Sequence, residues 1–463
     1  MQDLTTGSIP RHLLKTSGFM LVTMVFQTLY LLIDLYWVGR LGKEAVAGVS
    51  VSGNLTMIVV AITQVLAVGT TTAIAHAAGR RDHARAQAVF KQSLVLSALV
   101  GGLFLVVAMA FRGPYSRSLA ADETTAALAI DYLLWFVPAM ALQFFMISMS
   151  AALRGTGNFR PGMIVQTATV IINMVLAPAL MFGWLGGRPL GVTGTAIASF
   201  IAIAVGTVWL ALYFRPAESY LRFERHGWRP HLGLWRQMLA IGLPAGAEFA
   251  LMAVYLVIVY IVARPFGAAA QAGFSIGMRI MQSLFLPVVA LSMGVAPLAG
   301  QSFGARNAAR VREVFTTSAM IAAAFMTVLV IVCHIAPEAL IRIFSTDPDV
   351  IAVGDEYLRI VSWNFVASGI VFVTASMFQA MGNTIPSLIT SCVRLFVVAI
   401  PAFALAQLPG FELRWIWYLT VLSVTLQLAM ALTLLRREFR LRLNFEGAAP
   451  VATPAFFAAP EQG

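Results

Sequence analysis

Two acidic side chains, Asp34 and Glu248, lie within long apolar segments of the 463-residue sequence. A charged group at the centre of a lipid bilayer costs about 2.5–3.5 kcal/mol on insertion scales, so an acid in such a segment needs either a partner or a function. A poorly solvated carboxylate gains free energy when it binds a proton or a monovalent cation. Both acids are therefore candidates for ion-binding chemistry.

Asp34 belongs to a polar stripe in the first apolar segment. Thr23, Gln27, Tyr30 and Asp34 follow one another at spacings of four, three and four residues, which places them on one face of a helix. Such a face would be unfavourable against lipid, so we expect it to line the interior of a helix bundle. We predict that Asp34 binds a proton or a cation and that Gln27 and Tyr30 contact a bound small molecule. The alternative is an Asp34 that only anchors neighbouring helices by hydrogen bonds.

Glu248 lies about twelve residues into the seventh apolar segment, near the middle of a bilayer at about 1.5 Å per helical residue. It shares a helix face with Met252 and Tyr255, whose polarisable and aromatic side chains suit flat lipophilic cations. Glu248 is predicted to bind the positive group of a substrate or a second proton. It could instead be the neutralised structural partner of Arg279, which we expect to be a buried, paired cation in the eighth segment.

The composition determines the class of protein that must position these residues. Hydrophobic residues make up 59% of the chain and charged residues 11%, whereas soluble domains carry about 25% charged residues. A soluble enzyme is therefore excluded. Backbone polar groups must be paired inside lipid, so long apolar runs are helices. Twelve such segments are predicted, at 13–37, 47–75, 90–112, 125–150, 161–183, 192–214, 237–263, 272–299, 315–342, 350–379, 386–406 and 414–435.

The basic residues are distributed unevenly between the predicted loops. With a cytoplasmic N-terminus, the inner segments hold twenty Lys and Arg residues and the outer segments eight. This bias predicts that both termini are cytoplasmic, and it accounts for the net charge of +11 without a nucleic-acid partner. The sequence shows no metal-ligand spacing and no phosphate-binding loop for ATP.

The sequence also contains an internal repeat, because sliding it on itself by 225 residues aligns identical residues in several segments. The matches include Gly79, Arg81 and Arg85 with Gly304, Arg306 and Arg310, and Gly157 with Gly382. Each repeat holds six segments, so both enter the membrane in the same orientation, as two six-helix bundles with a cleft between them. The predicted domains are an N-terminal lobe (1–214), a cytoplasmic linker (215–236), a C-terminal lobe (237–440) and a disordered tail (441–463).

Several stretches resemble the multidrug and toxic compound extrusion (MATE) family. They are TLYLLIDLYWVGRLGKEAVAGVS (28–50), AGRRDHARA (78–86), ALRGTGNFRPGM (152–163), INMVLAPALMFGWLGGRPLGVTGTAIAS (172–199), APLAGQSFGARNAARV (296–311) and FQAMGNTIPS (378–387). The likeness covers about residues 12–440 and is nearer to the bacterial DinF-like and NorM-like branches. It implies a monomeric twelve-helix antiporter of the bacterial inner membrane. Such a protein expels organic cations and other amphiphilic toxins against an inward proton or sodium gradient, without a cofactor.

The resemblance also assigns residues to a cation site. In the family pattern Asp34 occupies this site, Asn173 matches the asparagine of the fifth helix, and Thr195 matches the threonine of the sixth. A second acid that often follows the asparagine is replaced here by Ala177. One carboxylate holds sodium less tightly than two, so a proton is the favoured coupling ion and sodium the alternative. Asn173 and Thr195 could also form ordinary interhelical hydrogen bonds.

Two other functions compete with export. A lipid-linked oligosaccharide flippase would share the two-bundle plan, but its cleft should carry several cations for a pyrophosphate, and the sequence offers chiefly Arg279. An integral membrane enzyme would need a polar catalytic cluster near one interface. Asp347, Asp349, Asp355 and Glu356 form such a group without a nearby histidine or metal spacing, so we predict a transporter and not an enzyme.

Overall fold

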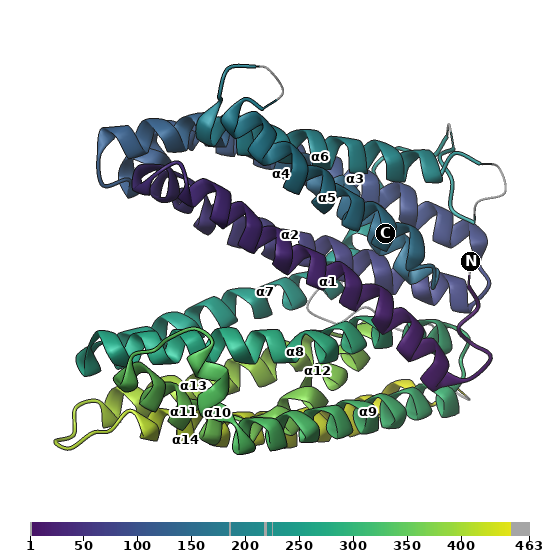
Figure 1. Ribbon diagram of the computed structural model, residues 1–463. Helices are drawn as coiled ribbons and strands as arrows, with labels where there is room; N and C mark the ends of the chain where they lie inside the picture. The colour runs from purple at the N-terminus through teal and green to yellow at the C-terminus, as the bar shows by residue number, and fades with distance from the viewer. Residues whose placement is uncertain (1, 185–186, 217–219, 225, 446–463) are drawn as a thin grey trace, which may run out of the picture. The chain divides into compact units, whose positions relative to one another are not determined.

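The computed structural model describes residues 2–184, 187–216, 220–224 and 226–445 (Figure 1). These residues form helices and contain no strand, which confirms the predicted all-α class. The helices are α1 (Ile9–Gly39), α2 (Lys43–Gly79), α3 (His83–Leu119), α4 (Glu123–Gly155), α5 (Arg160–Phe182), α6 (Gly191–Tyr213), α7 (Leu232–Ala263), η1 (Arg264–Phe266), α8 (Gly267–Gly304), α9 (Ala308–Ile335), α10 (Pro337–Arg342), α11 (Pro348–Val361), α12 (Asn364–Ala380), α13 (Ile385–Leu405) and α14 (Arg414–Arg442).

The helices are long and apolar enough to make this a membrane protein. Among the described residues, 10 helical stretches meet the requirements of a membrane span, or up to 11 with the bent pair of α11 and α12. One of these stretches, Leu232–Gly304, contains two predicted segments because α7, η1 and α8 follow without a gap. Every apolar segment predicted from the sequence therefore corresponds to a helix or a helix pair.

Two of the predicted segments are divided. The segment 315–342 separates into α9 and α10 at Pro337, which has no backbone N–H to continue a helix but fits the first turn of a new one. The segment 350–379 bends by 57° between α11 and α12. Apolar composition predicted the length of both segments but gave no signal for the bend.

The described chain divides into two compact units. The first consists of residues 2–3 and Phe19–Gly242, and the second of Leu4–Gly18 and residues 243–445. These boundaries differ from the predicted ones, because the predicted linker and the first turns of α7 belong to the first unit, and the first turns of α1 belong to the second. The predicted tail starts within α14, and residues 446–463 lie outside the described residues.

Left-handed backbone turns recur at the spacing of the sequence repeat. Arg81 has a φ of 58° and Arg306 a φ of 57°, and they are the two non-glycine residues with positive φ in the described chain. Gly157 and Gly382, also 225 residues apart, have φ values of 78° and 73°. Non-glycine residues rarely adopt this conformation, so its recurrence at matching positions supports an internal repeat.

The first turns of α7 pack closely on α2 within the first unit. A Cβ atom added to Gly69 would overlap the carbonyl group of Met238, and one added to Gly242 would overlap the carbonyl group of Val65. Only glycine allows such a close approach of two helix backbones. These contacts explain why α7 joins the first unit as far as Gly242.

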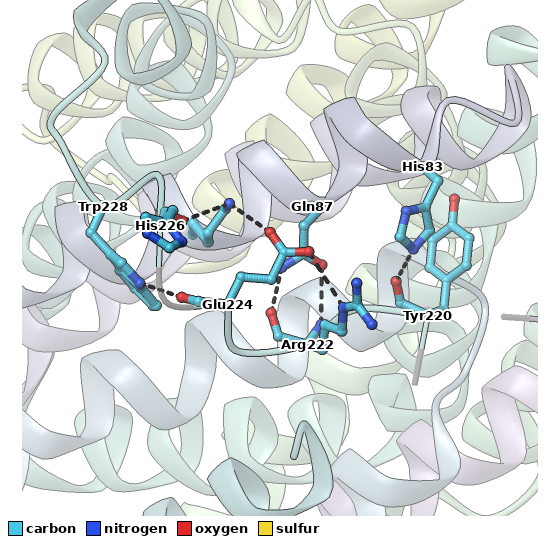
Figure 2. Close-up of polar contacts among 8 residues, drawn as sticks. His83, Gln87, Tyr220, Arg222, Glu224, His226 and Trp228 are labelled. Atoms are coloured by element: carbon cyan, nitrogen blue, oxygen red, sulfur yellow. Dashed lines mark hydrogen bonds and ion pairs between the residues drawn. The ribbon is translucent and has the colours of Figure 1, made fainter. Parts of the chain in front are cut away.

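The chain that precedes α7 lies along α3 as a strap, defined here as residues 220–224 and 226–231 (Figure 2). The Gln87 carboxamide donates to the carbonyl of Arg222 and accepts from its backbone N–H at 3.0 Å. The Gln92 carboxamide donates to the Arg229 carbonyl at 2.8 Å and accepts from the His231 N–H at 2.9 Å. Two buried glutamines therefore bind the main chain of the strap, as a neighbouring β-strand would.

An ion pair fixes the middle of the strap. Lys91 Nζ donates to Glu224 Oε2 at 2.9 Å and to the His226 carbonyl at 3.0 Å, and the Lys91 side chain is only 11% exposed. Near the start of the strap, His83 Nε2 lies 2.6 Å from the Tyr220 carbonyl oxygen. The hydrogen bond from Lys91 lowers the pKa of Glu224, with Arg222 contributing in the same direction. The predicted linker is therefore bound to α3 at several positions between Tyr220 and His231.

We predict that the contribution of Glu224 to stability depends on pH. Because its pKa is lower in the folded protein than the ordinary value of 4.5, the stabilisation is present above pH 4.5 and is lost as the pH falls through the folded pKa. Glu224→Gln should lower the Tm of the detergent-solubilised protein at pH 7, and the difference from wild type should disappear under acidic conditions. Glu123→Gln, at an exposed ion pair, is the control. A difference that persists unchanged at low pH would contradict this prediction.

Candidate functional site

Three helices of the first unit bring polar side chains together around Tyr30. Asn173 Nδ2 on α5 donates to Ser199 Oγ on α6 at 2.8 Å, and the Tyr30 hydroxyl on α1 lies 3.5 Å from the same Ser199 oxygen. Asp34 follows Tyr30 by one turn of α1. Its Oδ1 is buried and has no hydrogen-bond partner among the described residues. A buried carboxyl oxygen without a donor is suited to binding a proton or a small cation.

Ser199, and not Thr195, contacts Asn173 in this cluster. Thr195 Oγ1 donates to the Val192 carbonyl of its own helix at 2.9 Å. Thr195 and Ser199 are one turn apart on α6, so the sequence gave no means of choosing between them. Ala177 follows Asn173 by one turn of α5 and is 2% exposed, so an apolar methyl group occupies the position of the family's second acid.

The remaining residues of the predicted polar stripe do not join this cluster. Thr23 is buried and donates to the Phe19 carbonyl of its own helix at 3.0 Å. Gln27 is exposed, and the described part of the chain offers its side chain no hydrogen bond. Of the stripe, Tyr30 therefore contacts the cluster, and Asp34 lies one helical turn further along α1.

Glu248 lies in a second polar cluster, within the second unit. Its Oε1 accepts hydrogen bonds from Ser387 Oγ at 2.5 Å and from Ser391 Oγ at 3.1 Å, both on α13. Gln427 Nε2 on α14 lies 3.4 Å from Ser391 Oγ, and the buried Gln427 Oε1 has no partner among the described residues. The cluster combines one carboxyl group with hydroxyl and amide groups from three helices.

Tyr255, which was predicted to contact substrate, lies close to an arginine of the second unit. The Tyr255 hydroxyl lies 3.1 Å from Thr420 Oγ1, and the Arg394 guanidinium lies 5.1 Å from the centre of the Tyr255 ring. Arg394 Nε is buried and has no hydrogen-bond partner in the described ranges. Met252 is 50% exposed. The cation–π geometry therefore assigns Arg394 to this region of the second unit.

The prediction of a buried, paired cation at Arg279 is not matched by the structure. Arg279 is exposed, and it forms no ion pair with Glu248 or another described acid. Its neighbours Met278 and Ile280 are buried, so Arg279 projects from α8 away from the core. The helical spacing of the polar residues shows that they share one face of α8, but it does not show whether that face is buried or exposed.

Sequence reasoning missed several members of the Glu248 cluster. Ser387, Ser391 and Arg394 follow one another on α13 at spacings of four and three residues, which is the signal that places them on one helix face. Asp131, near the start of α4, is a further acid in a predicted span that the sequence analysis did not select, and its side chain is exposed.

The outer acids have structural roles. Asp347 accepts from the Asp349 backbone N–H at 2.9 Å and so caps α11, and Asp355 forms an ion pair with Arg359 at 2.8 Å. In the described chain, no group of three or more His, Cys, Asp or Glu side chains is arranged to hold a metal ion. These contacts favour a structural interpretation over a catalytic cluster.

Ser387→Ala should destabilise the second unit more than Ser283→Ala. Removing the Ser387 hydroxyl takes a donor from a buried carboxyl group, which costs about 1–3 kcal/mol. Ser283 is exposed and donates only to the Arg279 carbonyl of its own helix, so it is the matched control. Thermal unfolding in detergent measures both variants. Equal Tm values for the two would show that the Glu248 contact does not stabilise the unit.

The chain was compared with known proteins. The MatE family model matches residues 20–179 and 244–404, one match in each repeat and more than half of the chain in total. The chain is 24% identical over 404 residues to a probable multidrug resistance protein, YoeA, of Bacillus subtilis, covering 86% of this chain and 87% of the relative. It is 27% identical over 410 residues to a FAD transporter of Shewanella oneidensis, covering 87% and 89%.

A solved structure has the same fold. It is an outward-facing multidrug resistance MATE transporter, with a TM-score of 0.87 and 24% sequence identity, and the alignment covers 95% of this chain and 98% of the other. This similarity supports the twelve-helix, two-bundle architecture predicted from the sequence.

Proposed function

Because the chain belongs to the MatE family, we propose that it exports amphiphilic organic cations across a membrane in exchange for an inward-moving proton. Membership of this family supports a transporter over an enzyme. The observation that carries the proposal is the buried, unpartnered Oδ1 of Asp34, one helical turn from the Tyr30–Ser199–Asn173 cluster. The bacterial inner membrane and a monomer with cytoplasmic termini are parts of the same proposal.

A proton is favoured over sodium by the groups around Asp34. Sodium is bound best by several oxygen ligands, preferably with more than one carboxylate. Here Ala177 replaces the second acid, and the Asn173 amide already donates to Ser199. A proton needs only the one free carboxyl oxygen. Protonation from outside would neutralise Asp34, and deprotonation inside would restore its charge for the next cycle.

The surroundings of Glu248 support the proposal that the cargo is cationic. Its carboxyl group is held by two serine hydroxyls, and it lies on α7 with Met252 and Tyr255. The FAD transporter of Shewanella oneidensis raises an anionic dinucleotide as an alternative cargo. A pyrophosphate would need several cations, and the same requirement applies to a lipid-linked oligosaccharide. Arg394 is the one cation that contacts the Glu248–Tyr255 region within the described residues, so the acidic site favours a positive cargo.

Asp34→Asn should abolish export while the protein stays folded. The amide has the size of the carboxyl group but cannot take up and release a proton. Transport of cationic dyes into everted vesicles, driven by a pH gradient or by a sodium gradient, measures the effect. Glu123→Gln, which removes an exposed carboxylate, is the control and should export normally. Full export by Asp34→Asn would reject the proton site, and export by the wild type driven only by sodium would reject the proton as coupling ion.

Ser199→Ala should reduce the initial export rate more than Thr195→Ala. Without Ser199 the buried Asn173 amide loses its acceptor, at a cost of about 1–3 kcal/mol, which corresponds to about a tenfold effect on a rate. Thr195 bonds only within its own helix, so its loss should change the rate by less than about twofold. The same vesicle assay compares the two variants. A larger effect at Thr195 would restore the family-pattern assignment.

A further inference from the structure

The loops between α2 and α3 and between α8 and α9 place an arginine in the same position. Asp82 caps α3 and accepts from the Arg85 backbone N–H at 2.9 Å, and Asn307 caps α9 and accepts from the Arg310 N–H at 3.0 Å. Each cap follows the left-handed residue of its loop directly. The two arginines, which are 225 residues apart, are therefore presented by the same local backbone geometry.

Arg310 binds the backbone of the segment that leads into α1. Its Nε and Nη2 donate to the Leu4 carbonyl at 3.2 and 3.0 Å, and Nη2 also lies 3.0 Å from the carbonyl oxygens of Thr6 and Gly7. The Leu4 N–H donates to Gln301 Oε1 on α8 at 3.0 Å. The Leu4 side chain is fully buried in the core of the second unit. We call the contacts between Arg310 and these three carbonyls the Arg310 clamp.

The clamp depends on the shape of the guanidinium group. Arginine presents five donors in a rigid planar arrangement, and its hydrogen bonds are strengthened by the positive charge. Lysine carries the same charge on a single nitrogen at the end of a flexible chain, so it cannot reproduce the paired donation of Nε and Nη2 to the Leu4 carbonyl. Among the described residues, Arg310 has no ion pair with an acid, so its charge is directed to the carbonyl oxygens.

The first unit holds the segment that leads into α7 in a corresponding way. Arg85 Nη2 donates to Gln237 Oε1, on the second turn of α7, at 2.8 Å. The strap just before α7 is bound to α3 by Gln87 and Lys91 (Figure 2). Gln92 binds it as well. The segments before α1 and α7 are thus each held by the beginning of α9 or α3, in the opposite repeat.

Both of these helices carry a candidate ion-binding acid further along. Helix α1 belongs to the second unit as far as Gly18 and to the first unit from Phe19 onwards, where Asp34 lies. Helix α7 belongs to the first unit as far as Gly242 and then to the second, where Glu248 lies. Each acid is therefore on a helix whose first turns are fixed to the other repeat.

We propose that Arg310 is a positioning residue for the transport cycle, a role that rests on the proposed export function. The Arg310 clamp holds the first turns of α1 against α8 and α9. A displacement of these turns is passed along the continuous helix to Tyr30 and Asp34. Loss of the clamp should therefore slow the change in access to Asp34 without altering the groups that bind cargo.

Arg310→Lys tests the proposal, with Arg312→Lys as the matched control because Arg312 is exposed two residues further along α9. The purified variants are compared by backbone hydrogen exchange and, in vesicles with a pH gradient, by the kinetics of dye transport. We expect faster exchange in residues 9–18 of Arg310→Lys, a maximal rate about tenfold lower, and a KM within about twofold of wild type. Arg312→Lys should match the wild type in all three measurements.

Three results would overturn the proposal. Unchanged exchange in residues 9–18 would show that the clamp does not hold α1. Faster exchange with an unchanged maximal rate would show that the clamp has only a structural role, and a raised KM at an unchanged maximal rate would place Arg310 in cargo binding. A wild-type protein that moves no dye would contradict the proposed export. Hydrogen exchange needs no cargo, so it would still show whether Arg310 holds the first turns of α1.

Discussion

The shortage of water inside a bilayer determines how this molecule uses its polar atoms. Within an apolar span, each buried donor or acceptor must find its partner in the chain itself. Most serines and threonines of the spans meet this requirement by donating to a carbonyl one turn back in their own helix, as Thr195 does. Asp34 Oδ1 is one of several buried polar atoms that have no partner among the described residues, and the Glu248–Ser387 contact is one of several hydrogen bonds between helices. Both involve an acidic side chain within an apolar segment, and an acid can also take up and release a proton.

The segments before α1 and α7 lie outside the spans and are held in a related way. An extended backbone leaves its carbonyl and N–H groups without internal partners, and here side chains bind them. In the first unit two glutamines and a lysine do this for the strap, and in the second unit Arg310 does it for residues 4–7. The two repeats therefore share a local arrangement, and not an identical sequence, in these segments. In each repeat an arginine follows a helix-capping residue by three positions.

The sequence was informative where a single strong preference decides the structure. Apolar length predicted the helices, and the 225-residue offset predicted an internal repeat, which the left-handed turns at Arg81 and Arg306 support. It could not choose between positions that are physically equivalent, as for Thr195 and Ser199 on one face of α6. It also failed for Arg279, because helical spacing does not say which face is buried. The true unit boundaries lie inside α1 and α7, where composition does not change.

The strap has a consequence for how this part of the chain can diverge. Gln87 and Gln92 bind its main-chain atoms, so these hydrogen bonds do not depend on which side chains the strap carries. Leu221, Phe223 and Glu224 add contacts that do depend on the side chain, through core packing, a ring contact with Phe90 and the ion pair with Lys91. The length of the strap is constrained, because the two glutamines lie at a fixed separation on a rigid helix and bind carbonyl groups that are seven residues apart. The number of residues between Arg222 and Arg229 is therefore constrained by the two glutamines, whatever the side chains between them.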